Sequence, residues 1–389
     1  MAKRYVDDYD DEEIRPRKKS SGKGGSSSGR KSSGKKKSGK KAQAKKQRRR
    51  IILFIIEIII LLIAVVILYA VLAGTKSGKV ELKEKDIIIN ETVQEAQETT
   101  MKGYRNIALF GVDSTTGALT KNTRSDTIMI ASINQDTGEC KLVSVYRDTY
   151  LNLSNDSYNK CNAAYAKGGP EQAINMLNMN LDMNITDFVT VGFAGLADTI
   201  DALGGVDIEV DESEVSHLNN YQLCIAEDLK REYTPVTQTG YQRLDGLQAT
   251  GYCRIRYTAG DDFKRAERQR EVLSAVADQA KKASLPKLTE TANSVFEEVY
   301  TSLDLSEIVE MLGDVGAYQI TETDGFPQED MRATGTIGSK GSCVIPTSLE
   351  ENVKWLHEFL FDASDYEPSA TVKECSEKIY QDTSGYLTK

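Results

Sequence analysis

The sequence predicts an α/β fold, a layered αβα domain with a central mixed sheet, preceded by one transmembrane helix. The domain is predicted by short apolar runs rich in β-branched residues, which alternate with helix-length segments beyond residue 103. Strands that alternate with helical patterns are typical of a sheet with helices on its faces. The transmembrane helix is predicted by residues 51–73, which contain a single charged residue.

Residues 1–50 are basic and low in complexity. They hold 19 of the 49 lysine and arginine residues but only 6 of the 58 acidic residues, so the remainder of the chain is acidic. A segment with so few apolar residues cannot offset the entropy of ordering, and it is therefore predicted to be disordered. Beside a membrane span it is expected to lie against anionic lipid head groups. Nucleic acid is the weaker alternative and is not predicted as a partner.

Residues 51–73 are predicted to cross a membrane as one helix. Their length suits a bilayer core of roughly 30 Å, and apolar residues on every face are rare in soluble helices. A cleaved signal peptide is the alternative, but its apolar core is usually shorter. Arg48, Arg49 and Arg50 flank the span on its N-terminal side. This charge asymmetry places the N-terminus in the cytoplasm and residues 74–389 outside the cell.

Residues 74–102 are predicted to form a polar extracellular stalk, and residues 103–362 to form the folded domain. The first strands are expected in NIALFGVD, TIMIASI and KLVSVY. The segment YNKCNAAYAKGGPEQAINMLNMNLDM indicates two helices separated by Gly-Gly-Pro. A strand in FVTVGF, a helix in AGLADTIDALGG and a strand in VDIEV complete this half of the domain.

The second half is predicted to begin with a short helix and an extended segment in LDGLQATGYCRIRY. A long helix follows over residues 262–283, with Asp261 or Asp262 as its N-terminal cap. Residues 287–362 are expected to be helical at first, then mixed, and to end in the amphipathic NVKWLHEFLF. Residues 363–389 have few apolar anchors and are predicted to be a loosely held tail.

Common catalytic motifs are absent from the sequence beyond the low-complexity tail. It contains no G-x-S-x-G, HExxH or Walker loop, which leaves little support for triad hydrolases, zinc proteases or nucleotide triphosphatases. His217 and His357 are expected to be ordinary surface or half-buried residues. The six cysteines show no CxxC spacing, so no zinc ribbon is expected. Disulfides and free thiols both stay open.

Residues 253–270, CRIRYTAGDDFKRAERQR, hold five arginines in a part of the chain that is otherwise acidic. Arg254 and Arg256 are two apart in an expected extended segment, so both side chains leave on one face. On the following helix, three and four residue spacings place further polar side chains on a common face. These helical residues are Arg265, Arg268 and Gln269.

Two more arginines lie upstream, Arg124 in TRSDT and Arg147 in VYRD. Arginine forks bind phosphate oxygens in pairs and stay charged at any accessible pH. Together with the cluster at residues 253–270, they predict a site for an anion at the meeting of an extended segment and a helix start. Lys264 and Arg270 are instead expected to be surface charges.

Asp113 and Asp126 predict a cation site beside these arginines. Asp113 ends FGVD, at the end of one expected strand, and Asp126 lies in RSDT, directly before the next one. Magnesium is commonly held by one or two carboxylates together with substrate phosphates and water. Arginine forks with a carboxylate-held Mg²⁺ form an apparatus suited to a pyrophosphate substrate.

Seven segments, in this order, resemble the LytR-CpsA-Psr family of bacterial cell-envelope enzymes. They cover residues 105–283, and the single-span topology agrees with the family. The segments are NIALFGVDS, TRSDTIMIASIN, LVSVYRDTYLNL, YNKCNAAYAKGGPEQA, FVTVGFAGLADTIDALGGVDIEV, LDGLQATGYCRIRY and DFKRAERQR.

The resemblance implies an apolar groove that holds a polyprenyl chain. It also implies transfer of a glycopolymer, such as teichoic acid or capsular polysaccharide, from a polyprenyl-pyrophosphate carrier to peptidoglycan, outside a bacterial cell membrane. Asp113 and Asp126 match the family's magnesium-binding aspartates. The residues that match pyrophosphate or head-group contacts are Arg147, Arg254, Arg256, Arg265 and Gln269, with Arg124 and Arg268 as adjacent family arginines. Lys264 and residues 258–260 depart from the family pattern.

A phosphoryl transfer of this kind would depend on positioning and charge neutralisation. A sugar hydroxyl of peptidoglycan would attack the phosphorus nearest the glycopolymer, and polyprenyl phosphate would leave. Asp261 or Asp262 is the hypothesised base, with Asp262 preferred. Two alternatives stay open: a hydrolase that uses water as the acceptor, and a non-catalytic anchored module that binds lipid or glycan.

Overall fold

A six-stranded mixed sheet forms the centre of the chain in the computed structural model. Within the residues that the structure describes, 82–113, 119–120, 122–256 and 260–386, these strands are β1 (Tyr104–Val112), β2 (Ser125–Asn134), β3 (Glu139–Val145), β6 (Asp187–Val191), β9 (Val299–Thr301) and β10 (Gln319–Phe326). Their order is β10-β3-β2-β1-β6-β9. β6 runs parallel to β1 and β10 parallel to β3, and the other pairs are antiparallel. The predicted mixed sheet is confirmed.

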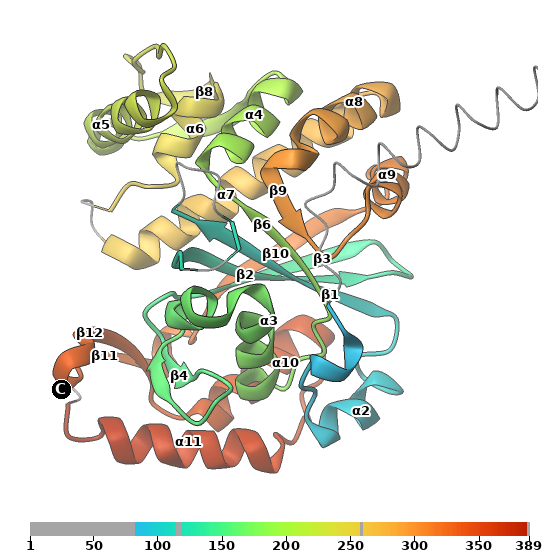
Figure 1. The fold of residues 1–389 in the computed structure, drawn as a ribbon, viewed down its shortest axis with the longest axis vertical. Helices are drawn as coiled ribbons and strands as arrows, with labels where there is room; N and C mark the ends of the chain where they lie inside the picture. The colour runs from blue at the N-terminus through green and yellow to red at the C-terminus, as the bar shows by residue number, and fades with distance from the viewer. Residues whose placement is uncertain (1–81, 114–118, 121, 257–259, 387–389) are drawn as a thin grey trace, which may run out of the picture. The chain divides into compact units, whose positions relative to one another are not determined.

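Helices cover both faces of the sheet, which confirms the layered arrangement (Figure 1). They are α3 (Asn162–Leu181) and α10 (Leu349–Phe361) on one face, and α4 (Phe193–Leu203) and α7 (Asp261–Lys282) on the other. Side chains alternate along each strand. Phe110 and Ile130 therefore enter the core shared with α3 and α10, whereas Leu109 and Ala131 face α7.

Helix α3 contains the break predicted from Gly-Gly-Pro. Gly169 has φ 69° and ψ −158°, values outside the helical region, so the helix is two segments joined at a kink. A Cβ atom at Gly169 would lie 2.7 Å from the carbonyl oxygen of Thr120. Glycine is needed here for both its left-handed φ and this close approach.

The two-stranded antiparallel sheet of β7 (Val206–Val210) and β8 (Gly240–Leu244) is separate from the central sheet. The strand predicted in VDIEV is thus confirmed, and so is the short helix α6 (Gly246–Tyr252). The other elements are α5 (Glu212–Leu229), α8 (Leu285–Val295), α9 (Leu305–Gly313), β4 (Tyr150–Asn152), β5 (Tyr158–Lys160), β11 (Arg332–Thr336), β12 (Ser342–Pro346), and the 3₁₀ turns η1 (Glu84–Asp86), η2 (Phe296–Glu298), η3 (Glu329–Met331) and η4 (Gly338–Lys340).

The segment predicted as a stalk, residues 74–102, joins the domain over much of its described part. Helix α2 (Glu91–Gln97) buries Val93 and Ala96 in the core beneath α3 and α10. Their three-residue spacing gives α2 one apolar face, which is why this otherwise polar segment packs. The stalk prediction is therefore wrong for these residues, and residues 74–81 lie outside the described part.

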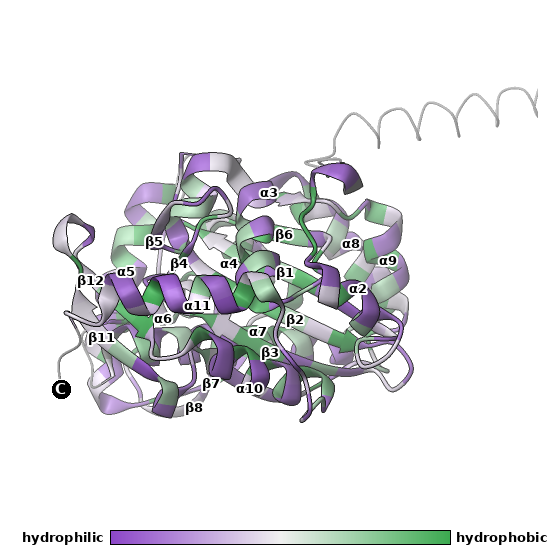
Figure 2. Cartoon of the chain, turned by 90° about the horizontal axis from the view of Figure 1, so that it is seen from below, coloured by the Kyte–Doolittle hydropathy of each residue, from purple (hydrophilic) through white to green (hydrophobic). Residues whose placement is uncertain are grey.

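The C-terminal residues also belong to the domain, contrary to the predicted loose tail at residues 363–389. Helix α11 (Ala370–Thr383) buries Val372, Cys375 and Ile379 in the same core. These residues are three and four positions apart, so they form one apolar stripe. Figure 2 shows polar and apolar residues alternating along α11. These few apolar residues are enough to hold α11 on the core because they lie on the same face of the helix.

The basic tail predicted at residues 1–50 and the membrane span predicted at residues 51–73 lie outside the described residues. Among the residues that the structure describes, none of the helices has the length and hydropathy needed to cross a bilayer. The cysteines, all within or beside described elements, are free thiols, and Cys224 is the exposed one.

A buried polar network ties the two ends of the domain together at Asp182. This side chain is fully buried and ends α3 in the left-handed conformation. Its Oδ1 accepts a hydrogen bond from Asn90 Nδ2 at 2.6 Å, and its Oδ2 accepts one from the backbone N–H of Ser369 at 2.7 Å. Beside it, His357 Nε2 lies 3.1 Å from the carbonyl oxygen of Leu181. The N-terminal and C-terminal segments thus share one carboxylate.

His357 is fully buried rather than on the surface or half-buried, and it should make stability depend on pH. Burial lowers the pKa of His357 to about 4, whereas an unfolded histidine titrates near ~6.5. Between these values the unfolded chain binds a proton that the folded chain does not. The free energy of unfolding should therefore fall as the pH drops below about 6.5, by up to ~1.4 kcal/mol per pH unit from this group.

Equilibrium urea unfolding at pH 7 and pH 5 measures this effect. A His357→Gln chain has no titrating ring at this position, so it should lose less stability over the interval than the natural chain. An equal loss in both chains would assign the pH dependence to other groups.

Candidate active site

A cavity of about 790 Å³ lies between the sheet and helices α4 and α7, and is called the main cavity below. The layers of a folded domain normally pack without voids of this size. Small-molecule sites commonly measure ~300–1,000 Å³. Its floor includes Leu109 on β1, Met129 on β2 and Val189 on β6, and its walls include Leu196 on α4 and Val276 on α7. The space between the two layers is therefore the leading candidate for a binding site.

The main cavity has an apolar interior and a charged end. The apolar lining residues are Leu109, Phe110, Val112, Met129, Val189, Val191, Leu196, Val272, Leu273, Val276 and Val299. The charged lining residues are Asp113, Arg124, Asp126, Arg147, Arg254, Arg256 and Arg265. Five of these are arginines and two are aspartates. A ligand that matches both parts has a long apolar chain and an anionic head.

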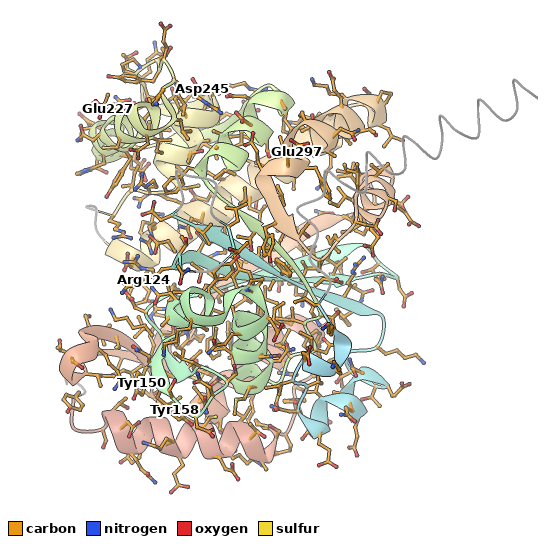
Figure 3. All side chains as sticks on the ribbon, in the orientation of Figure 1. Arg124, Tyr150, Tyr158, Glu227, Asp245 and Glu297 are labelled. Atoms are coloured by element: carbon orange, nitrogen blue, oxygen red, sulfur yellow. The ribbon has the colours of Figure 1, made fainter. Side chains whose placement is uncertain are left out.

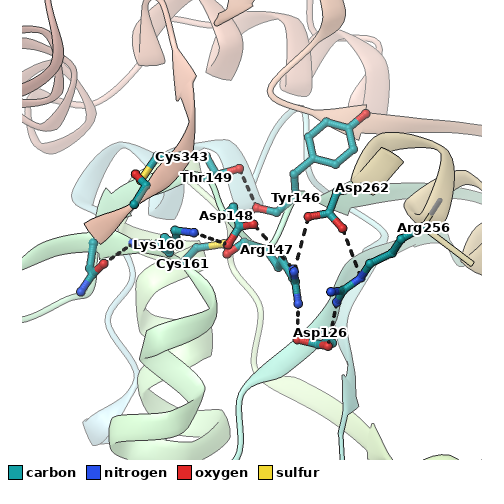
Figure 4. A network of polar contacts seen from close by, with 12 residues as sticks. Asp126, Tyr146, Arg147, Asp148, Thr149, Lys160, Cys161, Arg256, Asp262 and Cys343 are labelled. Carbon is teal, nitrogen blue, oxygen red and sulfur yellow. Dashed lines mark hydrogen bonds and ion pairs between the residues drawn. The ribbon is translucent and has the colours of Figure 1, made fainter. Parts of the chain in front are cut away.

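Arg147, Arg256 and Arg265 interleave with Asp126 and Asp262 at the charged end and form the arginine–aspartate cluster. Figure 4 shows Asp126, Arg147, Arg256 and Asp262. Asp126 Oδ1 lies 2.8 Å from Arg147 Nη1, and Asp126 Oδ2 lies 3.4 Å from Arg256 Nη2. Asp262 lies 3.4 Å from Arg147 Nη2, 3.5 Å from Arg256 Nε and 3.3 Å from Arg265 Nη1. Each aspartate therefore touches at least two arginines.

The chain delivers these residues from separate elements. Asp126 is at the start of β2 and Arg147 follows the end of β3. Asp262 and Arg265 lie in the first turns of α7. The predicted cap of α7 is wrong, because Gly260 with φ 95° occupies the cap position and both aspartates are already helical. At the helix N-terminus the carboxylate of Asp262 still meets a favourable helix dipole.

Electrostatics set the protonation state of the cluster. Burial would raise the pKa of Asp262, but the charges of Arg265, Arg147 and Arg256 outweigh it and hold that pKa below its usual value. Burial and the like charge of Arg147 lower the pKa of Arg265 to about 10, so Arg265 remains charged at neutral pH. A carboxylate with a lowered pKa is a weaker base. The arrangement therefore disfavours proton abstraction by Asp262, whose role as the base stays a prediction.

The LytR-CpsA-Psr family model matches residues 68–344, more than half of the chain. This chain belongs to the LytR-CpsA-Psr family. The matched range contains every residue of the arginine–aspartate cluster and all six strands of the central sheet.

Relatives and solved structures agree with this assignment. Biofilm regulatory protein A of Streptococcus mutans is 28% identical over 303 residues, which cover 67% of this chain and 72% of that protein. The polyisoprenyl-teichoic acid–peptidoglycan teichoic acid transferase TagV of Bacillus subtilis is 32% identical over 191 residues, 47% of this chain and 46% of that protein. The crystal structure of B. subtilis TagV superposes with a TM-score of 0.54 and 25% identity, and covers 69% of this chain and 99% of that chain.

The sequence analysis predicted an extended segment for Arg254 and Arg256, the two family arginines after α6. Neither residue lies on a strand in the structure. Arg254 is in a turn and Arg256 in irregular backbone. Both side chains nevertheless reach the main cavity. The guanidinium of Arg254 lies 4.3 Å from the ring centre of Phe193 and 5.4 Å from that of Tyr221. Within the described part of the chain, Arg254 therefore contacts aromatic rings rather than a carboxylate.

Phe193 and Tyr221 were missed in the sequence analysis. Phe193 was assigned to a strand but begins α4, and Tyr221 lies on α5 in a stretch that carried no prediction. A readable signal for α5 was the capping box of Asp211 and Glu214, which precedes its apolar positions.

Arg268 does not line the main cavity, and its predicted substrate contact has no support from its position. The residue is 1% exposed, and its Nε lies 2.7 Å from Glu214 Oε1. It thus joins α7 to α5 within the fold. Arg270 is also buried and is not the surface charge that was predicted. Lys264 contacts Glu267 at 2.7 Å, in keeping with a surface role.

The remaining predicted site residues line the main cavity. Gln269 donates a hydrogen bond from Nε2 to the carbonyl oxygen of Cys253 at 3.4 Å. Arg124 is exposed and lies near the beginning of α7 (Figure 3). Asp113 is exposed at the end of β1.

Asp113 and Asp126 give the main cavity two oxygen donors for a cation. Among the described residues there is no group of three or more His, Cys, Asp or Glu that could hold a metal ion. Both oxygens of Asp126 already contact arginines. A magnesium ion fits this donor set if substrate phosphates complete its ligands, as is common for Mg²⁺. The magnesium site stays a prediction.

Proposed function

We propose that this chain transfers a glycopolymer, of teichoic acid or capsular type, from a polyprenyl-pyrophosphate carrier to peptidoglycan. The observation that carries the proposal is the main cavity, whose apolar interior ends in five arginines. An isoprenoid chain needs the first part and a pyrophosphate the second. The name of the relative TagV, a polyisoprenyl-teichoic acid–peptidoglycan teichoic acid transferase, supports the same reaction class.

The carrier would lie with its polyprenyl chain between the sheet and α7. Leu109, Met129 and Val276 present apolar surface along that path, and burial of apolar surface releases about 25 cal/mol per Å². The pyrophosphate would then meet Arg147, Arg256 and their neighbours at the charged end. The interior fixes how deep the carrier enters, so the reacting phosphorus is placed by the whole ligand rather than by the head alone.

The reaction would replace a phosphoanhydride bond by a phosphodiester bond. A sugar hydroxyl of peptidoglycan forms a bond to the phosphorus that carries the glycopolymer, and the bond from this phosphorus to polyprenyl phosphate breaks. The hydroxyl proton goes to a base, for which Asp262 is the candidate, and the leaving group departs as an anion. Arg147, Arg256 and Arg265 stabilise the charge that develops on the phosphate oxygens. Magnesium held by Asp113 and Asp126 would supply further charge neutralisation.

We also propose that residues 51–73 anchor the enzyme in a bacterial cell membrane, with the basic tail in the cytoplasm and the domain outside. This arrangement is supported by the arginines that flank the span on its N-terminal side. It would place the main cavity in the compartment that contains both the lipid carrier and peptidoglycan.

Incubation of the full chain with lipid-linked polymer, magnesium and peptidoglycan tests the reaction. Polymer covalently attached to glycan is the expected product. Free polymer without attachment would indicate a hydrolase, and an unchanged but bound carrier would indicate a binding module. Either of these two results would overturn the transferase proposal.

Replacement of Phe193 by leucine should weaken the reaction without unfolding the domain. Leucine keeps apolar volume beside Arg254 but removes the ring over which its guanidinium lies. A cation–π contact contributes about 0.5–2 kcal/mol, so kcat/KM for the lipid-linked substrate should fall by about 2–30-fold. Initial rates at several carrier concentrations measure this change. Phe193→Tyr retains a ring and should recover most of the loss, whereas equal rates for both variants would contradict the role of the ring.

A further inference from the structure

A second cavity, of about 480 Å³, lies on the other side of α7 and is called the rear cavity below. From α7 it is lined by Glu267, Arg270 and Glu271, whereas the same helix turns Arg265 and Gln269 into the main cavity. The two-stranded sheet of β7 and β8 and strand β10 complete its walls. None of the described residues that line one cavity lines the other. The rear cavity is therefore a separate site that shares a helix with the main one.

Arg270 lines the rear cavity with a guanidinium that lacks hydrogen-bond partners in the described part of the chain. The residue is only 9% exposed, and its Nε and Nη1 are enclosed by protein without a hydrogen-bond partner among the described residues, which leaves Nη2 as the nitrogen able to reach the cavity. Burial lowers the pKa of Arg270, yet a guanidinium keeps its charge in a protein. Buried charged donors are normally satisfied. Through Nη2, Arg270 can therefore donate to a ligand with acceptor atoms.

The other charges of the rear cavity restrict what that ligand can be. Five carboxylates line it, but Asp207, Glu267 and Asp278 are paired with Arg243, Lys264 and Lys281. Glu209 and Glu271 then stand against Arg270 and Lys282, so the charges of the cavity are close to balanced and favour a ligand without net charge. A lone metal ion has no group of three ligands among the described residues, and Arg270 would repel it. A hydroxyl fits, because it accepts from a guanidinium and donates to a carboxylate without a net charge.

Tyr241 adds a flat aromatic face to this polar cavity. It lies on β8, lines the cavity and is 73% exposed, the largest exposure among the exposed large apolar and aromatic side chains that the structure describes. An amphipathic aromatic ring offers a large apolar contact area at low entropic loss. A sugar ring is its counterpart, since it has an apolar C–H face and a rim of hydroxyls.

We propose that the rear cavity binds a neutral, hydroxyl-rich saccharide, with Arg270 donating to its oxygens and Tyr241 stacking on its ring. The saccharide belongs to the acceptor glycan, an identity that rests on the proposed transfer to peptidoglycan. A polymeric acceptor spans many sugar rings, so one part of it occupies the rear cavity while another part reaches the cluster at the start of α7. The rear cavity then contributes to the KM for acceptor rather than to the chemical step.

A calorimetric titration of the full chain with a soluble N-acetylglucosamine tetramer measures binding in the absence of the lipid carrier. Tyr241→Ala and Arg270→Met should each weaken binding about tenfold or more, since a hydrogen bond to a charged group contributes about 1.5–3 kcal/mol. Tyr380→Ala is the matched control. Tyr380 is 61% exposed on α11, outside the rear cavity, and its removal should leave the affinity unchanged.

Tyr241 is exposed, so its replacement keeps the test open even if Arg270→Met impairs folding. The proposal is overturned if the natural chain does not bind the tetramer, if both variants bind it as well as the natural chain, or if inorganic phosphate binds at Arg270 instead. Transfer assays separate this result from the proposed function. A chain that binds the tetramer but never attaches polymer to glycan would sink the transferase proposal and retain the saccharide site.

Discussion

Arg256→Gln is expected to lower the rate of polymer transfer by about 10²–10³-fold, the usual effect of removing one donor that stabilises charge in the transition state. Arg256 contacts both aspartates of the cluster, at 3.4 Å and 3.5 Å, and lines the main cavity. Its side chain is 32% exposed, so loss of these ion pairs should change the free energy of unfolding by no more than about 1 kcal/mol. Initial rates at saturating carrier, together with urea unfolding, separate the two effects.

Arg105→Gln is the control for this prediction. Arg105 lies at the opposite end of β1, pairs with Asp187 at 2.9 Å and has a side chain 28% exposed, but it does not line the main cavity. Its replacement should leave the transfer rate within about twofold, as expected for a surface substitution. Similar rate losses in the two variants would show that the effect comes from general disruption rather than from the site.

Asp182→Ala should destabilise the domain by about 3 kcal/mol or more, because two hydrogen bonds to a charged group are lost in the core at about 1.5–3 kcal/mol each. The backbone N–H of Ser369 would be left unpaired in the core, and the Asn90 amide would keep only its contacts with the Met179 carbonyl oxygen and Ser369 Oγ. The single tryptophan, Trp355 on α10, reports on unfolding in urea. Backbone amides near Asn90 and near Ser369, at the two ends of the domain, should both lose protection from hydrogen exchange.

Asp362→Ala provides the matched control. Asp362 also ends its helix, α10, in the left-handed conformation, with φ 55° against 50° for Asp182. Its side chain is 80% exposed and contacts Lys141. Both substitutions place alanine at a left-handed position, so the difference between them isolates the buried hydrogen bonds. Asp362→Ala should cost about 1 kcal/mol, and equal losses would show that backbone strain, not the network, sets the effect.

Much of the fold was readable because its signals are local. Alternating apolar runs predicted the strands, and Gly169 marked the kink in α3. The two ends of the domain were not predicted correctly, because their few apolar residues pack only once the core exists to receive them. Val372 and Ile379 had the right spacing, but spacing alone does not show that a surface is available.

The site was predicted as a set of residues rather than as a geometry. Arg147, Arg256 and Arg265 do gather at one end of the main cavity. Arg268 could not be separated from them by sequence, since its partner Glu214 lies 54 residues away on α5. Neighbouring positions on a helix point in different directions, and only tertiary packing decides which of them meets the cavity and which meets another helix.

In the arginine–aspartate cluster, the positive charges are already paired with carboxylates of the same chain. Asp126 and Asp262 occupy the forks of three arginines, so an incoming phosphate must displace carboxylates instead of filling open positive charge. A small free anion gains little from that exchange. Under the proposed function, burial of the polyprenyl chain in the main cavity would drive this exchange, so the site would favour a lipid-linked phosphate over a free one.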